Sequence, residues 1–161
     1  MVSVYHMRMR YQAIISAPFA KIGIRCNDAL LLGVDFLPPN VPELNPQNKI
    51  SASLCHQICN YLENPTSQFS VGLKPAGTPH QIKVWQEIAA IPAGYTRSYG
   101  ELASILNSSA QAVGQACGAN AFPIIIPCHR VVGKKSIGGF MNQAGGSSID
   151  IKRWLLEHER R

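Results

Sequence analysis

The segment Pro123-Ile-Ile-Ile-Pro-Cys-His-Arg-Val-Val132 places one cysteine and one histidine between two apolar runs. The thiolate is the reactive form of cysteine, and a neighbouring imidazole within apolar walls raises its fraction. Pro127 has no N–H to donate to a sheet, so it predicts a strand end or turn just before Cys128. Cys128 is therefore a candidate nucleophile, although a cysteine in an apolar run is often only a small buried side chain.

The composition indicates a globular chain, because 46% of its 161 residues are hydrophobic. This length allows one large domain or two small ones. No apolar run approaches the ~20 residues of a membrane span, and no signal-peptide pattern is present at the N-terminus. Five cysteines without regular spacing fit a reducing compartment. We therefore expect a cytoplasmic protein.

Cys55, His56 and Cys59 are the nearest approach to a metal-binding cluster in the sequence. In a helix the two cysteines share a face, but His56 points away from it, so we expect no metal site. The cysteines other than Cys128 are interpreted as structural, namely Cys26, Cys55, Cys59 and Cys117.

The net charge of +6 is unevenly distributed. Residues 78–161 carry nine Lys/Arg against five Asp/Glu, whereas residues 1–77 carry six against four. The second half is therefore the better candidate for binding a polyanion.

The first half of the chain predicts a small α/β unit. Three short strands are expected over residues 11–16, 21–26 and 29–36, the last two joined by a tight turn at Asn27-Asp28. Apolar residues every four positions predict a helix over 50–62 that ends before Asn64-Pro65. A fourth short strand is expected near Phe69.

The second half predicts helices with clear start signals. Lys74-Pro75-Ala76-Gly77 is a linker, which places a domain boundary near residue 77. Thr78-Pro79-His80-Gln81 opens one helix with an N-cap, a proline in the first turn and a glutamine three residues after the cap. Similar signals at Ser98 to Glu101 and at Ser108 to Gln111 open two more, and a last helix is expected over residues 150–159.

Two short capped helices joined by a tight turn are typical of a helix-turn-helix, whose second helix docks on DNA. Here the second helix, through Ala112 and Gly114, consists mostly of small residues. Such a helix allows close backbone approach to a narrow groove and carries little sequence code. The same composition also suits a helix that packs closely on its neighbours.

The hexapeptide Pro127-Cys128-His129-Arg130-Val131-Val132 resembles the active-site signature of the O6-alkylguanine-DNA alkyltransferases, also called methylated-DNA–protein-cysteine methyltransferases, and the likeness extends from Trp85 to Glu159. The resemblance implies an α/β fold with two domains. Residues 1–77 would form a ribonuclease H-like domain without that enzyme's carboxylates. Residues 78–161 would form a helix-turn-helix, winged-helix-like domain that holds the active site. The implied partner is double-stranded DNA, bound in the minor groove by a monomer with little sequence preference.

The resemblance also implies a chemistry. Glu159 orients His129, which acts through a water to deprotonate Cys128, and the thiolate takes the alkyl group from O6-alkylguanine, or from O4-alkylthymine, in a flipped-out nucleotide. Tyr99 rotates the 3′ phosphate and donates to the leaving base, and Asn120 forms a hinge. The thioether is not reversed, so each molecule acts once, with no cofactor and no metal.

The remaining predicted site residues fall into two groups. The DNA contacts are Gln111, Ala112, Gly114, Gln115, Ser98 and Arg130. The substrate pocket comprises Pro123, Val131, Phe140 and Met141, with the glycine-rich loop over 133–139 as one wall.

Two positions depart from the family pattern. Gln111 stands where the family usually has the arginine that fills the space left in the base stack, and Phe140 stands where it often has tyrosine. The first change weakens the expected support for the extruded state, and the second removes a hydroxyl from the pocket.

Two other classes share part of the pattern. Alkyltransferase-like proteins bind the lesion and recruit other repair factors, but they lack the cysteine that is present here at position 128. A Cys-His-Glu hydrolase or acyltransferase would use a similar triad. It would show multiple turnovers, which separates it from a single-use acceptor.

Overall fold

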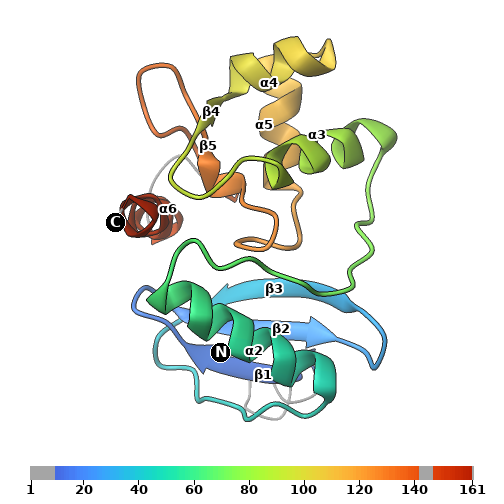
Figure 1. The fold of residues 1–161 in the computed structure, drawn as a ribbon, viewed down its shortest axis with the longest axis vertical. Coiled ribbons are helices and arrows are strands. Elements are labelled where there is room, and N and C mark those ends of the chain that lie inside the picture. Colours follow the sequence, from blue (N-terminus) through green and yellow to red (C-terminus); the bar gives the residue numbers. More distant parts are fainter. Residues whose placement is uncertain (1–9, 142–146, 161) are drawn as a thin grey trace. The chain divides into compact units, whose positions relative to one another are not determined.

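The computed structural model describes residues 10–141 and 147–160. The chain divides into two compact units, Met1–Lys74 and Pro75–Arg161. The first combines an antiparallel sheet with a helix, and the second is mainly helical with one short parallel strand pair (Figure 1). This mixture of helices and strands agrees with the predicted α/β class. Within the described ranges, no helix is both long enough and apolar enough to cross a membrane.

The sheet of the first unit is an antiparallel meander. Its strands, in spatial order, are β1 (Ala13–Ser16), β2 (Lys21–Cys26) and β3 (Leu31–Leu37). Ile22 and Ile24 of the central strand are fully buried, so the β-branched residues that favour a strand also supply its core face. The predicted three-stranded meander is confirmed.

The turn between β2 and β3 is longer than predicted. The side chain of Asn27 accepts hydrogen bonds from the backbone N–H groups of Ala29 (2.8 Å) and Leu30 (2.7 Å). Asparagine favours this local arrangement because its side chain mimics a backbone turn. As a result β3 begins at Leu31 and not at residue 29.

The helix α2 (Lys49–Glu63) packs on the sheet and confirms the predicted helix (Figure 1). Asn48 and Ser51 form a capping box at its start, which satisfies two backbone N–H groups that would otherwise lack partners. Leu54 and Ile58 are fully buried, as their spacing of four residues requires of one helical face.

The strand predicted near Phe69 is wrong. Residues 64–74 run as irregular chain with a single bridge, between Leu73 and Leu31. The ring of Phe69 lies 5.7 Å from that of Tyr61, centroid to centroid. Aromatic packing on α2 and two hydrogen bonds between the Gln57 amide and the Ser70 backbone therefore hold this segment in place of a strand ladder.

The second unit is built from three short helices, a 3-10 turn and a last helix. In chain order its elements are α3 (Pro79–Ala89), β4 (Arg97–Ser98), α4 (Tyr99–Leu106), α5 (Ala110–Gly118), η1 (Cys128–Arg130), β5 (Val131–Val132) and α6 (Ser147–Glu159). Helix α3 starts with the predicted capping box, in which the side chains of Thr78 and Gln81 each accept from the other's backbone N–H. The cap of α4 is Ser98, as predicted.

The cap of α5 is one residue later than predicted. The Ser109 hydroxyl accepts from the Ala112 N–H, whereas the Ser108 hydroxyl lies 2.7 Å from His80 Nε2. Two adjacent serines offer equivalent capping groups, and only the partner in α3 distinguishes them.

Two contacts organise the second unit around the cysteine segment: one joins two of its helices, and the other pairs the residues after Cys128 with the strand before α4. The indole Nε1 of Trp85 in α3 donates to the Ala116 carbonyl in α5 at 2.8 Å, so the two helices approach closely. Strands β4 and β5 pair in parallel, with Arg97 opposite Val131 and Ser98 opposite Val132. This pairing places the residues after Cys128 beside the start of α4.

Candidate active site

The backbone around Cys128 is a tight turn. Pro127 precedes the 3-10 turn η1, which Cys128 begins, so the cysteine lies in a turn and not in a strand. Ile124 has φ of 73°, which is unusual for a β-branched residue. The Ile126 N–H donates to the Phe122 carbonyl at 2.8 Å, which closes the segment around this residue. Strained backbone of this kind is common at functional sites.

Asn120 binds the cysteine sulfur. Its Nδ2 donates to Cys128 Sγ (3.1 Å) and to the Ile126 carbonyl (2.9 Å), while its Oδ1 accepts from the Phe122 N–H (2.9 Å). The backbone contacts fix the orientation of the amide, so its N–H points at the sulfur. A donor to sulfur favours the thiolate. Asn120, which was predicted to form a hinge, therefore also donates a hydrogen bond to the candidate nucleophile.

A second cysteine lies against the first. The thiols of Cys117 in α5 and Cys128 share a hydrogen bond, which raises the pKa of Cys128 and lowers that of Cys117. Burial also raises the pKa of Cys128, whereas Asn120 and Lys152 lower it. The net effect is a pKa of Cys128 well above the ordinary value of a thiol.

His129, Arg130 and Glu159 form a buried charged cluster. Nε2 of His129, which is fully buried, lies 3.0 Å from Glu159 Oε1, although the contact is poorly aligned for a hydrogen bond. Arg130 donates to both carboxylate oxygens, at 2.9 and 2.7 Å, and to the Ile91 carbonyl at 2.6 Å. The structure thus brings Glu159 of α6 to the histidine, as predicted.

The protonation states within the cluster follow from these contacts. Burial opposes the charge on Glu159, but the hydrogen bonds from Arg130 and the close contact with His129 outweigh it and lower the pKa of Glu159 to about 2. Burial, with the charges of Arg130 and Lys152, lowers the pKa of His129 against the opposing effect of Glu159. At neutral pH the carboxylate is therefore charged and the imidazole is neutral. Its Nδ1 is buried and has no hydrogen-bond partner within residues 10–141 and 147–160.

The guanidinium of Arg130 is not directed at the surface. The sequence predicted a DNA contact here, but the side chain is only 12% exposed and its donors are occupied by Glu159 and Ile91. A buried carboxylate needs a paired cation, and a planar guanidinium matches its two oxygens. We therefore place Arg130 with the carboxylate and not with DNA.

Tyr99 and Lys152 form the other side of the site. The half-buried Tyr99 hydroxyl donates to the Gly139 carbonyl at 3.3 Å. Lys152, fully buried in α6, donates to the carbonyls of Gly139 (2.8 Å) and Val131 (2.6 Å), and its Nζ lies 5.8 Å from the centre of the Tyr99 ring. At Gly138, with φ of 73°, a Cβ would lie 2.7 Å from the Tyr99 ring, so a side chain cannot be accommodated without displacing Tyr99.

Burial governs the ionisation of both side chains. It raises the pKa of Tyr99 to about 12, so the hydroxyl remains a hydrogen-bond donor. It lowers the pKa of Lys152 to about 8, and the charges of Cys117 and Cys128 act against that shift. Lys152 was not among the site residues predicted from the sequence. Its position three residues from both Ile149 and Leu155, on the apolar face of the last helix, is the signal that could have identified it.

The other predicted residues occupy three kinds of environment. The buried ones are Pro123, Val131 and Phe140. The exposed ones are Gln111, Gln115 and Met141. The half-buried ones are Ala112, Gly114 and Ser98, whose hydroxyl also caps α4. On α5 the two glutamines, four residues apart, therefore offer polar side chains to solvent.

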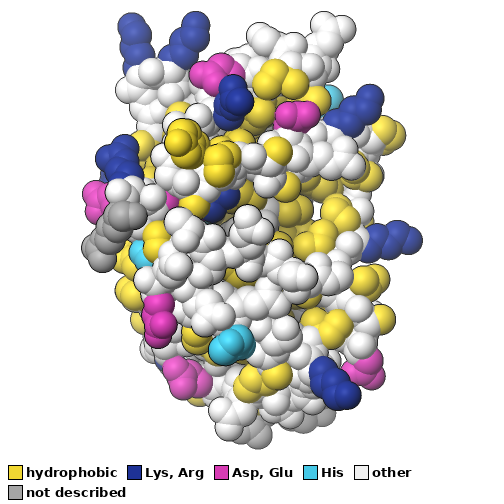
Figure 2. All heavy atoms as spheres, in the orientation of Figure 1, with side chains coloured by type: hydrophobic (Ala, Val, Ile, Leu, Met, Phe, Trp, Pro, Cys, Tyr) yellow, Lys and Arg dark blue, Asp and Glu magenta, His cyan; other side chains and the backbone are white. Residues whose placement is uncertain are grey.

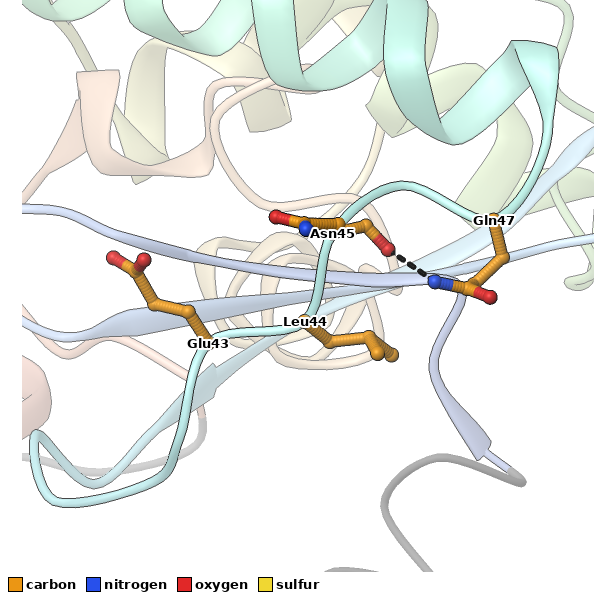
Figure 3. A pocket seen from close by; sticks show the side chains of 4 residues that line it. All are labelled: Glu43, Leu44, Asn45 and Gln47. Carbon is orange, nitrogen blue, oxygen red and sulfur yellow. Dashed lines mark hydrogen bonds between the residues drawn. The ribbon is translucent and has the colours of Figure 1, made fainter.

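Two surface hollows lie in the described part of the chain. One of about 600 Å³ opens at the start of α4 beside β5, where Ser98, Glu101 and Lys134 line it. Another, of about 360 Å³, lies in the first unit and is lined by Glu43, Leu44, Asn45 and Gln47, with the Gln47 amide bonded to the Asn45 carbonyl (Figure 3). Neither lining includes a cysteine or histidine.

The surface charge is dispersed. Among the described residues on the face shown in Figure 2, Lys and Arg side chains lie singly or in pairs, mostly near the margin. On this face the positive charge therefore does not by itself mark a binding site. No group of three or more His, Cys, Asp or Glu residues able to hold a metal occurs in the described ranges.

The sequence is similar to known proteins over most of its length. Residues 79–161 match the model of the 6-O-methylguanine DNA methyltransferase, DNA binding domain. A constitutive methylated-DNA–protein-cysteine methyltransferase of Bacillus subtilis is 40% identical over 72% of each chain. A methylated-DNA–protein-cysteine methyltransferase of Mycobacterium bovis is 34% identical over 91% of this chain and 90% of its own.

Solved structures agree with these matches. The crystal structure of the Mycobacterium tuberculosis O6-methylguanine methyltransferase has a TM-score of 0.75 and 30% identity over 91% of this chain and 90% of its own. M. tuberculosis OGT in complex with DNA gives the same score and identity over 91% of each chain. The matched segment contains Cys128, its neighbours and the last helix. The chain therefore belongs to the O6-methylguanine DNA methyltransferase family.

Proposed function

We propose that this protein repairs DNA by transferring the alkyl group of O6-alkylguanine, or of O4-alkylthymine, to Cys128, once per molecule. As a member of the family it is a DNA-binding methyltransferase of DNA repair. The surroundings of the Cys128 sulfur support this assignment. The Asn120 amide donates a hydrogen bond to the sulfur at 3.1 Å, and the next residue in the chain is His129, which pairs with the buried Glu159. No other described cysteine has these neighbours.

The proton leaves Cys128 towards the imidazole. His129 is neutral, and its Nδ1 has no hydrogen-bond partner among the described residues, so a water can connect this nitrogen to the thiol. The carboxylate of Glu159 compensates the positive charge that the imidazole gains, and Arg130 keeps that carboxylate ionised. The thiolate then attacks the alkyl carbon, and the base leaves with its bonding electron pair. Tyr99, whose hydroxyl stays protonated, would donate a hydrogen bond to the leaving base.

DNA binding is assigned to the pair α4–α5. These helices contact each other and are joined by a short turn, as in a helix-turn-helix whose second helix approaches DNA. Small residues on α5 suit the minor groove and give little sequence preference. The reactive base must be flipped out, at a cost of a few kcal/mol. Tyr99 would turn the 3′ phosphate, and Gln111 would occupy the space that the nucleotide leaves.

The two domains are assigned as residues 1–77, ribonuclease H-like, and 78–161, helix-turn-helix and winged-helix-like. The antiparallel sheet with one packed helix supports the first, and the capped helices with the cysteine segment support the second. A cytoplasmic monomer is also proposed. The five free cysteines support a reducing compartment.

Stoichiometry tests the function directly. Mixed with excess O6-methylguanine duplex, the protein should gain one methyl group, a mass increase of about 14 Da, since a thioether is a poor leaving group. Peptide mapping should place the gain on Cys128. Sustained turnover would indicate a hydrolase-like reaction, and a methyl group on another cysteine would contradict the proposed acceptor.

Gln111 provides a test of how α5 lies on DNA. We expect Gln111→Arg to speed repair of duplex substrate, since a guanidinium can stack and hydrogen-bond in the gap left by the flipped nucleotide. Repair of the free O6-methylguanine base needs no flipping and should change little. The measurement is the ratio of the two single-turnover rates, with Gln111→Ala expected to lower it.

Gln115→Arg is the matched control, because Gln115 is also exposed and lies one turn further along α5. It adds the same charge and should tighten binding at low salt through phosphate attraction. At saturating DNA it should leave the duplex-to-base ratio unchanged. Equal ratios in the wild type, Gln111→Arg and Gln111→Ala would show that residue 111 does not enter the duplex.

A further inference from the structure

Lys152 is a buried cation that the chemistry proposed above does not use. Its side chain in α6 is fully buried, and an ammonium group is costly to remove from water unless its donors find partners. Here Nζ donates to the Val131 carbonyl at 2.6 Å and to the Gly139 carbonyl at 2.8 Å. It also lies 5.8 Å from the centre of the Tyr99 ring, within the range of a cation–π contact. One ammonium group therefore contacts β5, α4 and the glycine-rich loop over 133–139.

The groups that Lys152 contacts are the ones assigned to the base pocket. Val131 and the glycine-rich loop are predicted to line that pocket, and Tyr99 is proposed to donate to the leaving base. The Tyr99 hydroxyl donates to the same Gly139 carbonyl, at 3.3 Å. Two donors from two different helices, α6 and α4, therefore hold the end of the loop.

The loop has little structure of its own. Residues 133–139 form no helix or strand, and three of the seven are glycine, which leaves the backbone wide conformational freedom. The Gly138 N–H donates to the Ser136 hydroxyl at 3.2 Å, but this bond lies within the loop and does not tie it to another element. Hydrogen bonds from a charged donor are about twice as strong as neutral ones. The two bonds from Lys152 therefore fix the loop against β5.

We propose that Lys152 is a positioning residue for the base pocket: its ammonium group fixes the glycine-rich loop against β5 and so keeps the pocket ready to receive the alkylated base. This inference rests on the proposed function and adds a residue that acts through the loop. A site that is ready in only a fraction of the molecules binds its ligand more weakly by that fraction. Loss of the ammonium group should therefore weaken binding of the base and leave the groups that activate the thiol in place.

A direct effect of the charge on the thiol would have a different signature. The charge of Lys152 lowers the pKa of Cys128, but it is the smallest of the effects on that pKa. A role through the thiol predicts a change in the rate of transfer when the base is saturating. A role through the loop predicts a change in the concentration of base that gives half of that rate.

Single-turnover methylation by the free O6-methylguanine base separates the two roles. Lys152→Met keeps a long side chain but has no charge and no donor. We expect the half-saturating concentration of the base to rise about tenfold or more, while the rate at saturation falls less than about threefold. Arg153→Met is the matched control, since it removes an exposed cation from the next position of α6, and it should leave both values unchanged. A lower rate at saturation with an unchanged half-saturating concentration would overturn the proposal.

The wild-type protein allows the same comparison without a substitution in the buried site. Burial lowers the pKa of Lys152 to about 8, so its charge is present at pH 7 and largely lost at pH 9. The other titratable groups that interact with it are Tyr99, Cys117, Cys128 and His129, and ionisation of the thiols in this range changes the rate at saturation. The half-saturating concentration of the base should rise about threefold or more from pH 7 to pH 9 in the wild type, but not in Lys152→Arg, which keeps its charge. A wild-type value that does not change with pH would contradict the positioning role.

Limited proteolysis tests the loop without DNA or base. Lys134 and Lys135 are exposed in the loop, so trypsin can cleave after them when the loop opens. Cleavage at these two sites should be about fivefold or more faster in Lys152→Met than in the wild type, and unchanged in Arg153→Met. Equal cleavage rates in the three proteins would overturn the proposal. No alkyl group is involved, so this result is independent of the proposed function, whose own failure would appear as wild-type protein that gains no methyl group.

Discussion

Cys128→Ser should abolish methyl transfer while the protein still binds O6-methylguanine duplex. A serine hydroxyl keeps its proton at neutral pH and is a far poorer nucleophile than a thiolate, so a loss of at least ~10³-fold is expected. The oxygen keeps nearly the shape of the side chain and can still accept from the Asn120 amide. Intact mass after incubation measures transfer, and a gel-shift titration measures binding.

Cys55→Ser is the matched control for this substitution. Cys55 is also buried, and burial raises the pKa of its thiol to about 11, so it carries little thiolate at neutral pH. Its replacement should leave transfer at the wild-type rate in protein that remains folded. Methylation of Cys117 in the Cys128→Ser protein would show that the neighbouring sulfur is an acceptor too, and would contradict a single acceptor.

The local structure of this chain could be predicted well from sequence. Capping groups at Thr78 and Ser98, and apolar spacing over α2, reflect short-range physics that three or four residues determine. One failure was of a different kind. A segment near Phe69 with strand-like composition is fixed by aromatic packing on Tyr61, a contact that local patterns do not encode.

The candidate site was predictable only in part. The resemblance identified Cys128, His129 and Glu159, and the structure brings the last two within 3.0 Å. The resemblance gave no reason to expect that the Arg130 side chain points inward to the same carboxylate. It also gave no reason to expect that Lys152 is buried and donates to the Gly139 carbonyl of the glycine-rich loop. Charged side chains are normally assigned to the surface, and burial becomes favourable only when distant partners are known.

Glu159→Gln should cost stability as well as activity. The neutral amide cannot balance the charge of Arg130, whose side chain is 12% exposed and whose donors point at the lost carboxylate. Removing one partner of a buried ion pair typically costs 3–5 kcal/mol. The pKa of about 2 for Glu159 indicates a similar size, roughly 3 kcal/mol relative to an ordinary glutamate. The free energy of unfolding, measured with denaturant at pH 7, tests this value.

The same substitution should weaken the activation of Cys128. Without the carboxylate, the imidazole of His129 gains a proton less readily, so the thiol ionises at a higher pH. Methyl transfer should slow at neutral pH and recover in part as the pH rises. If the rate–pH profile of Glu159→Gln matches that of the wild type, the role of Glu159 is purely structural.

The dependence of stability on pH separates the ion pair from simple loss of packing. The folded-state pKa of Glu159 lies below its unfolded value, so its contribution is complete above about pH 5 and is lost as the pH falls towards 2. The difference in unfolding free energy between wild type and Glu159→Gln should therefore persist at pH 5 and fall to less than about half by pH 3. Glu157→Gln is the control, because Glu157 is exposed on the same helix and should change stability by less than about 0.5 kcal/mol at either pH. A difference that stays constant from pH 7 to pH 3 would assign the loss to packing of the side chain, and the charge of Glu159 would then have no part in holding the site together.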